Sequence, residues 1–214
     1  MGPRKIRKAL EFGKHLAPKV DFIAPRMLHA PYEKTCQAWG SENKQPLLIQ
    51  AHPQGQDDIC NLWSAFGTHA AIGVVMMKLD RIDITQTHIP AHYKFLRRLT
   101  PILLAARQNN KHVVGFSFGP SNNFGAQTKT PIKTTFDGLR IIIDRFVDAG
   151  HRGGGCGLLI EREHGKVLLT VHGYQLKARS VSPKAVFTRV LEFVKKELEA
   201  GQPGNLRTLR TFHA

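Results

Sequence analysis

Apolar residues in this chain form short runs and amphipathic stripes, which predict an alternation of strands and helices. Three continuous apolar runs are typical of buried strands, at residues 46–52, 70–79 and 112–118. A short helical pattern covers 57–66, and a longer amphipathic stripe covers 89–110. Pro101 lies inside that longer stripe, and we expect it to bend or divide the helix.

The second half of the chain predicts two more helices and a hairpin. Residues 134–149 carry apolar side chains at helical spacing, and Gly150 follows where such a helix would end. The sequence CGLLIERE–HGK–VLLTVHGYQ (156–175) predicts two strands joined by a tight turn. Residues 182–201 begin with Ser-Pro and end with Gly, which is typical of a helix. We expect the basic tail, 202–214, to be mobile.

This order of elements predicts an α/β or α+β single domain with one mixed sheet of about five strands covered by helices. A chain of 214 residues with 42% apolar residues can form one packed core. The core domain would occupy 46–201. Residues 1–45 would form a basic N-terminal helix and an extended arm, because prolines interrupt this region after residue 16. Residues 202–214 would be a basic C-terminal tail.

The formal net charge of +15 changes the picture, because it indicates a polyanionic partner. Positive charge is spread along the chain, and residues 84–136 contain no Asp or Glu. On the predicted helix 89–110, the residues Lys94, Arg97 and Arg98 fall opposite the apolar stripe, where they can contact several phosphates. Charge distributed in this way favours a nucleic acid over a single membrane-binding patch.

A loop of 15 residues, 119–133, adds a second candidate nucleic-acid contact. It offers amide groups, a phenyl ring for base stacking and two lysines, a combination typical of single-strand binding. The stretch GHRGGGCG (150–157) adds an arginine among glycines that let another backbone approach closely. The predicted nucleic-acid-binding residues are Arg4, Lys5, Arg7, Lys8, Lys94, Arg97, Arg98, Asn122, Asn123, Phe124, Lys129, Lys133 and Arg152.

Two sets of residues are candidates for catalysis. On the predicted helix 134–149, Asp137, Asp144 and Asp148 share one stripe, which is how a divalent-metal site of a nuclease begins. A solvent-exposed acidic face explains the same stripe. His52 and Asp57 form the second set, as a general base with its orienting group, although Asp57 equally suits a helix cap. We expect no cofactor and no resident metal ion.

The three cysteines, Cys36, Cys60 and Cys156, are odd in number and widely spaced, so we expect free buried thiols. This favours the cytoplasm or another reducing compartment. The basic, acid-poor start of the chain leaves mitochondrial targeting open. No apolar run reaches 18 residues, so we expect no membrane span.

Together these observations predict a nucleic-acid-binding protein that acts mainly through contacts with the phosphate backbone. RNA is favoured over DNA because the chain has no helix-turn-helix or zinc-finger pattern. Its partners would include the other proteins of a ribonucleoprotein particle. Two alternatives remain open: a metal-dependent nuclease or other enzyme acting on nucleic acid, and a regulatory protein that binds an acidic protein partner. The sequence favours binding over catalysis.

Overall fold

The computed structural model describes residues 8, 11–12, 15–16, 19, 32–39, 46–51, 56–77, 79–81, 83, 88–118, 131–148, 151–152, 155–163, 165–170, 173–185, 192–199 and 202–213. The helices there are α2 (Tyr32–Trp39), α3 (Gln56–Gly67) and α4 (Ile89–Gln108), with the 3₁₀ turn η1 (Leu79–Arg81). The strands are β1 (Leu48–Ala51), β2 (Gly73–Met76), β3 (Val113–Phe118), β4 (Ile132–Phe136), β5 (Leu139–Arg145), β6 (Val147–Asp148), β7 (His151–Arg152), β8 (Gly155–Glu161), β9 (Val167–Leu169), β10 (Tyr174–Ser180), β11 (Glu192–Leu198) and β12 (Leu206–His213).

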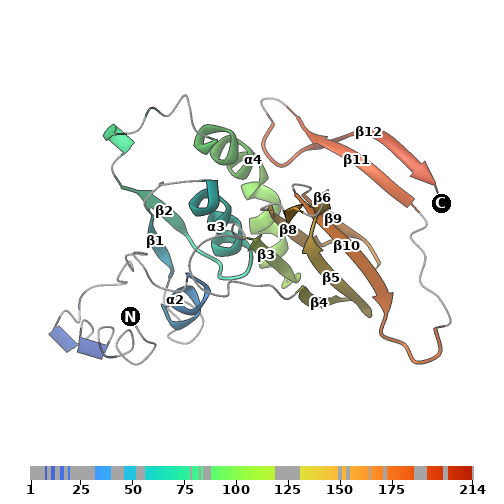
Figure 1. Cartoon of the computed structure of the whole chain (residues 1–214), viewed down its shortest axis with the longest axis horizontal. Helices are drawn as coiled ribbons and strands as arrows, with labels where there is room; N and C mark the ends of the chain where they lie inside the picture. Colours follow the sequence, from blue (N-terminus) through green and yellow to red (C-terminus); the bar gives the residue numbers. More distant parts are fainter. Residues whose placement is uncertain are drawn as a thin grey trace.

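The predicted single mixed sheet covered by helices is wrong, because the strands form several small separate sheets (Figure 1). The described residues contain two three-stranded antiparallel sheets, β3–β8–β9 and β4–β5–β10, and the two-stranded ribbons β6–β7 and β11–β12. Strands β1 and β2 form a parallel pair joined through α3. Within these residues, no helix is both long and apolar enough to cross a membrane.

Strand β8 lies at the centre of the fold and is buried on both faces. Cys156, Leu158 and Ile160 on one face pack with apolar residues of α3 and α4. Leu159 on the other face packs in a cluster with Phe136 and its neighbours in the β4–β5–β10 sheet. The β3–β8–β9 sheet is therefore the middle layer, between the helices and the second sheet, which explains the continuous apolar run in its sequence.

Several predicted elements are confirmed. The apolar runs at 46–52, 70–79 and 112–118 contain strands β1, β2 and β3, and the helical patterns at 57–66 and 89–110 correspond to α3 and α4. Pro101 lies inside α4, which continues past it, so the predicted division of this helix is wrong. The predicted hairpin is the antiparallel pair β8–β9.

The predicted helix 134–149 is wrong, because this segment folds as the hairpin β4–β5. Asp137 and Gly138 join the two strands, with φ angles of 41° and 78°. Positive φ at both positions is what a tight two-residue hairpin turn requires, and Asp-Gly is among its preferred sequences. Apolar residues then alternate toward the core, as Ile141 and Ile143 do. The helical pattern is thus also a strand pattern, and the described residues 134–148 contain no helix.

The predicted helix 182–201 and mobile tail 202–214 are also wrong in the described residues, where β11 and β12 pair as an antiparallel ribbon. Residues 186–191 lie outside the described residues. Leu198 is buried in the core of the helical layer, and the Gly204 amide donates a hydrogen bond to the Arg98 carbonyl in α4 (2.8 Å). Strand pairing and docking on α4 therefore override the local helix preference of this segment.

Helix α2 occupies part of the region for which the sequence predicts an extended arm. Cys36 of this helix packs with Leu47, Ile49 and Ala65, which belong to the β1–α3 region. Residues 32–39 are thus packed against the rest of the chain. The predicted helix at 3–16 falls mostly outside the described residues.

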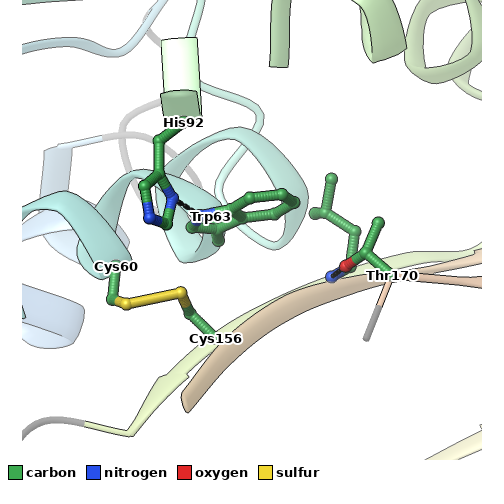
Figure 2. The surroundings of a disulfide bond; sticks show 6 residues. Cys60, Trp63, His92, Cys156 and Thr170 are labelled. Carbon is green, nitrogen blue, oxygen red and sulfur yellow. Dashed lines mark hydrogen bonds between the residues drawn. A yellow bond between two sulfur atoms is a disulfide. The ribbon is translucent and has the colours of Figure 1, made fainter. Parts of the chain in front are cut away.

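Cys60 in α3 and Cys156 in β8 form a disulfide, which corrects the prediction that both are free thiols (Figure 2). Their Cα atoms are 5.3 Å apart, and the buried Cys36 is not part of a disulfide. Beside the disulfide, the Trp63 indole donates a hydrogen bond to Nδ1 of His92 in α4 (2.9 Å). The disulfide thus joins α3 to the middle sheet, and the hydrogen bond joins α4 to α3. The prediction of a reducing compartment depended on unpaired cysteines, and Cys60 and Cys156 are paired. The location of the protein stays a prediction.

Tyr174 gives a pH-dependent contribution to stability. Its ring packs edge-on against Phe116 and its hydroxyl donates to the Thr170 carbonyl. Burial raises its pKa well above the ordinary value of 10.0. Above pH 10 the folded state thus keeps the neutral phenol, while the same group ionises in the unfolded chain. The contribution of Tyr174 to the free energy of unfolding is therefore present below pH 10 and is lost above it, at up to about 1.4 kcal/mol per pH unit. In urea titrations from pH 8 to 11, we expect Tyr174→Phe to flatten this loss.

Tyr93→Phe is the comparison for this experiment, because burial also raises the pKa of Tyr93 but its side chain is considerably more exposed. It should flatten the alkaline loss of stability less than Tyr174→Phe does. Equal slopes for Tyr174→Phe and the wild type would contradict the assignment.

Candidate functional site

The outer face of the β4–β5–β10 sheet carries a group of exposed basic side chains. Residues of these strands alternate between the core and solvent, and four solvent-side positions are cationic. We call them the basic sheet face, which consists of Lys133, Arg140, Lys177 and Arg179. The inward positions between them build the apolar core, so the sheet holds the four cations on one side.

The strand register places the four cations in two neighbouring rows. Lys133 and Lys177 lie on either side of Ile142, because both pair with it across the sheet. Arg140 and Arg179 face each other directly in the next row. Side chains opposite one another in an antiparallel pair have Cβ atoms about 5 Å apart. The fold therefore brings together charges that are up to 46 positions apart in the sequence, from Lys133 to Arg179.

Like charges at such distances repel, which makes this arrangement unfavourable for stability. Among the residues that the structure describes, none forms an ion pair with any member of the basic sheet face. The four charges are thus available to an external anion, whose binding would remove their mutual repulsion.

Other basic side chains already have structural roles. Arg107 donates hydrogen bonds to the carbonyls of Phe66 (2.8 Å) and Gly67 (2.6 Å), at the C-terminal end of α3. Desolvation lowers the pKa of this guanidinium, which nevertheless remains charged at neutral pH. Arg145 is buried with its guanidinium over the Phe118 ring, 5.3 Å from the centroid. Neither residue is available as a surface contact.

The predicted basic residues of α4 lie in a different layer from the basic sheet face. Lys94 and Arg97 are exposed on α4, which covers the opposite side of the middle sheet. Arg98 is half-buried, and its Nε atom has no hydrogen-bond partner among the described residues. Lys8 is exposed. Of the predicted nucleic-acid contacts, only Lys133 belongs to the basic sheet face.

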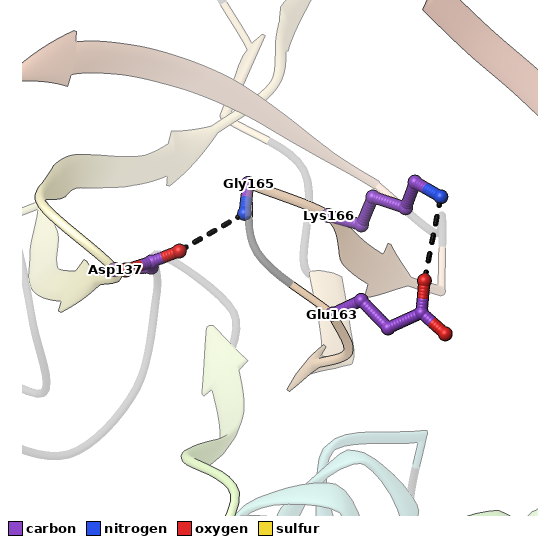
Figure 3. Close-up of polar contacts among 4 residues, drawn as sticks. All are labelled: Asp137, Glu163, Gly165 and Lys166. Carbon is purple, nitrogen blue, oxygen red and sulfur yellow. Dashed lines mark hydrogen bonds and ion pairs between the residues drawn. The ribbon is translucent and has the colours of Figure 1, made fainter.

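The predicted acidic stripe loses its basis, because the helix that would align it is absent. Asp137 lies in the β4–β5 turn, where its carboxylate accepts a hydrogen bond from the Gly165 amide (3.0 Å; Figure 3). This contact joins the β4–β5 turn to the β8–β9 turn, in which Lys166 and Glu163 pair at 3.5 Å. Asp144 lies on the outward side of β5 instead. The described residues contain no group of three or more His, Cys, Asp or Glu that could hold a metal ion.

The remaining predicted site residues cannot be placed. Those outside the described residues are Arg4, Lys5, Arg7, His52, Asn122, Asn123, Phe124 and Lys129. Three others lie in described backbone elements, but their side chains are not described: Asp57, Asp148 and Arg152.

Sequence reasoning missed three members of the basic sheet face, Arg140, Lys177 and Arg179. The Asp-Gly sequence could have indicated the β4–β5 hairpin turn. The strands on both sides of this turn place Lys133 and Arg140 on the solvent side. Lys177 and Arg179 are two residues apart in a strand, so they also share a face. Their position opposite β5 could not be inferred from local pattern, because 39 positions in the sequence separate Arg140 from its β10 partner, Arg179.

Comparison with known proteins identifies a family but no activity. A family model described as "Domain of unknown function (DUF5597)" matches residues 89–212, which is more than half of the chain. The chain therefore belongs to this family. The match contains α4, the strands from β3 to β11 and all of β12 but its last residue, including the basic sheet face, and leaves out the β1–α3–β2 unit. No curated protein matches the chain.

Proposed function

We propose that this member of the DUF5597 family binds nucleic acid through phosphate contacts, with RNA favoured over DNA, as part of a ribonucleoprotein particle. The basic sheet face carries the proposal, because it gathers four exposed cations without an ion pair among the described residues. The net charge of +15 supports the same partner, since it attracts polyanions over a long range.

The chemistry of the four side chains suits phosphate. Arg140 and Arg179 each present a planar guanidinium that can donate two parallel hydrogen bonds to one phosphate. Lys133 and Lys177 add compact charges in the neighbouring row. The preference for RNA rests on the absence of a helix-turn-helix or zinc-finger pattern in the sequence.

A four-charge substitution tests the proposal. The variant Lys133→Gln, Arg140→Gln, Lys177→Gln and Arg179→Gln should bind a labelled single-stranded RNA at least tenfold more weakly in fluorescence anisotropy at low salt. Its plot of log K against log salt should also be flatter by about 3, because each lost contact with a single strand removes about 0.7 from the slope.

The matched control removes the same charge from exposed positions elsewhere: Lys111→Gln, Arg162→Gln, Lys195→Gln and Arg81→Gln. We expect this variant to keep most of the affinity and the salt slope. Equal losses in the two variants would show that net charge alone drives binding. A wild-type protein that binds no nucleic acid at low salt would refute the function, and would favour the alternative of an acidic protein partner.

A further inference from the structure

We propose that the basic sheet face holds one backbone of a single-stranded nucleic acid by its phosphates, without reading the bases, and that Asp144 sets one end of this site. The inference rests on the proposed function and specifies its ligand. It follows from the dimensions of the face, from the side chains between its cations and from the position of the acid beside them.

The basic sheet face is too small to span both backbones of a duplex across the major groove. Adjacent strands are about 4.8 Å apart, so the backbones at Lys133 and Lys177 lie about 10 Å apart across β5. Along β10, Lys177 and Arg179 are two residues apart, or about 7 Å. The patch is thus narrower than the roughly 12 Å major groove of B-DNA, and the duplex in the test below distinguishes a single backbone from two backbones held across the roughly 6 Å minor groove. One backbone fits across the two rows.

The side chains between the cations do not provide a surface for base stacking. The other outward residues in these rows are Thr135 in β4 and Ile142 in β5, and Gln175 follows in β10. None is aromatic, whereas proteins that hold single strands by their bases stack them on aromatic rings. The bases therefore turn away from these two rows, and the contacts made there depend on phosphate alone.

Asp144 is the next outward residue of β5 beyond Ile142, in the row that contains Gln175. Its Oδ1 accepts a hydrogen bond from the Arg145 amide (2.8 Å), which holds the carboxylate at the edge of the basic sheet face. A phosphate in this row would meet a like charge within one Debye length, so the attraction of the two cationic rows ends there. The nucleic-acid backbone thus passes over the Arg140–Arg179 and Lys133–Lys177 rows and leaves the face before Asp144.

The test measures binding of the full chain to fluorescein-labelled eight-nucleotide oligonucleotides: dT₈, dA₈, rU₈ and a duplex of mixed sequence. We expect dT₈ and dA₈ to bind within about twofold of one another, with salt slopes near −3, as four phosphate contacts to a single strand require. Comparing rU₈ with dT₈ separates RNA from DNA as the source of the phosphates. A more than tenfold preference for one base, or a duplex slope well beyond about −3.6, would overturn the single-backbone assignment.

The role of Asp144 is tested by Asp144→Asn, which keeps a side-chain oxygen for the Arg145 amide. We expect it to bind dT₈ about threefold more tightly than wild type, because a screened repulsion at this spacing is removed. Asp80→Asn removes the same charge from an exposed site in η1 and should leave the affinity unchanged. Equal tightening by both variants would refute the role of Asp144. Absence of binding to every oligonucleotide would refute the proposed function itself. Binding with a strong base preference, or with the same affinity in Asp144→Asn and Asp80→Asn, would refute only the present inference.

Discussion

Replacement of Gly115 by alanine is expected to destabilise the protein by at least about 3 kcal/mol, because there is no room for a β-carbon where α3 crosses β3. A Cβ atom at Gly115 would overlap the Trp63 carbonyl oxygen and lie 2.7 Å from the Cα of Gly67. These neighbours are backbone atoms, so relief requires α3 to move away from the sheet.

That movement would also break local hydrogen bonds. The Thr68 hydroxyl donates to the Gly115 carbonyl (2.6 Å) and accepts from the Gly115 amide (3.1 Å). It would further loosen the core in which Leu62 and Trp63 of α3 pack against Leu158 of β8. In a domain of this size we expect a fall of roughly 10 °C in Tm, measured by far-UV circular dichroism.

Gly73→Ala is the matched control, since Gly73 is also a strand glycine. Its added Cβ would meet only the end of the flexible Leu48 side chain, at 2.9 Å. We expect a change in Tm of a few degrees at most. If Gly115→Ala melted within two or three degrees of wild type, the close approach of α3 to β3 would be incorrect.

Loss of the Cys60–Cys156 disulfide is expected to lower the free energy of unfolding by about 3 to 5 kcal/mol. The bridge closes a loop with a sequence separation of 96 residues, and a cross-link of that length strongly restricts the unfolded chain. Both cysteines are buried where α3 packs on β8, so alanine at both positions also loses packing. Guanidinium titrations with and without a phosphine reductant measure the effect.

The double variant Cys60→Ala, Cys156→Ala should be weakened relative to oxidised wild type and should not respond to the reductant. Cys36→Ala is the control, because Cys36 is not part of the disulfide and its loss should leave the response to reductant intact. Three titratable thiols in the denatured, non-reduced protein, together with equal stability in both buffers, would contradict the disulfide.

Local sequence pattern predicted secondary structure correctly where the structure of a segment depends on its own residues. Helix α4 has an apolar stripe long enough to bury, and Pro90 near its start matches a helix terminus. The run in β8 is continuous because both of its faces are covered. In contrast, residues 192–198 satisfy a helical pattern but pair with β12, a contact that no local preference encodes.

The candidate site divides in the same way. Composition and charge were sufficient to predict a polyanionic partner, because +15 is a property of the chain as a whole. The Asp-Gly turn is also local, and it places Lys133 and Arg140 on one side of a hairpin. The strand that pairs with β5, and the register of that pairing, depend on residues far apart in the sequence. The positions of Lys177 and Arg179 in the two rows therefore could not be predicted from local pattern.

The sequence by itself determined the charge of this protein, its principal helix, its three short apolar strands and its β8–β9 hairpin. Only the tertiary structure decided which strands pair, that Cys60 and Cys156 meet, and which cations share a face. The physical reason is that periodicity and turn chemistry act over a few residues. Strand register and cross-links instead depend on burying side chains from distant segments in one core, whose cooperative packing outweighs local preference.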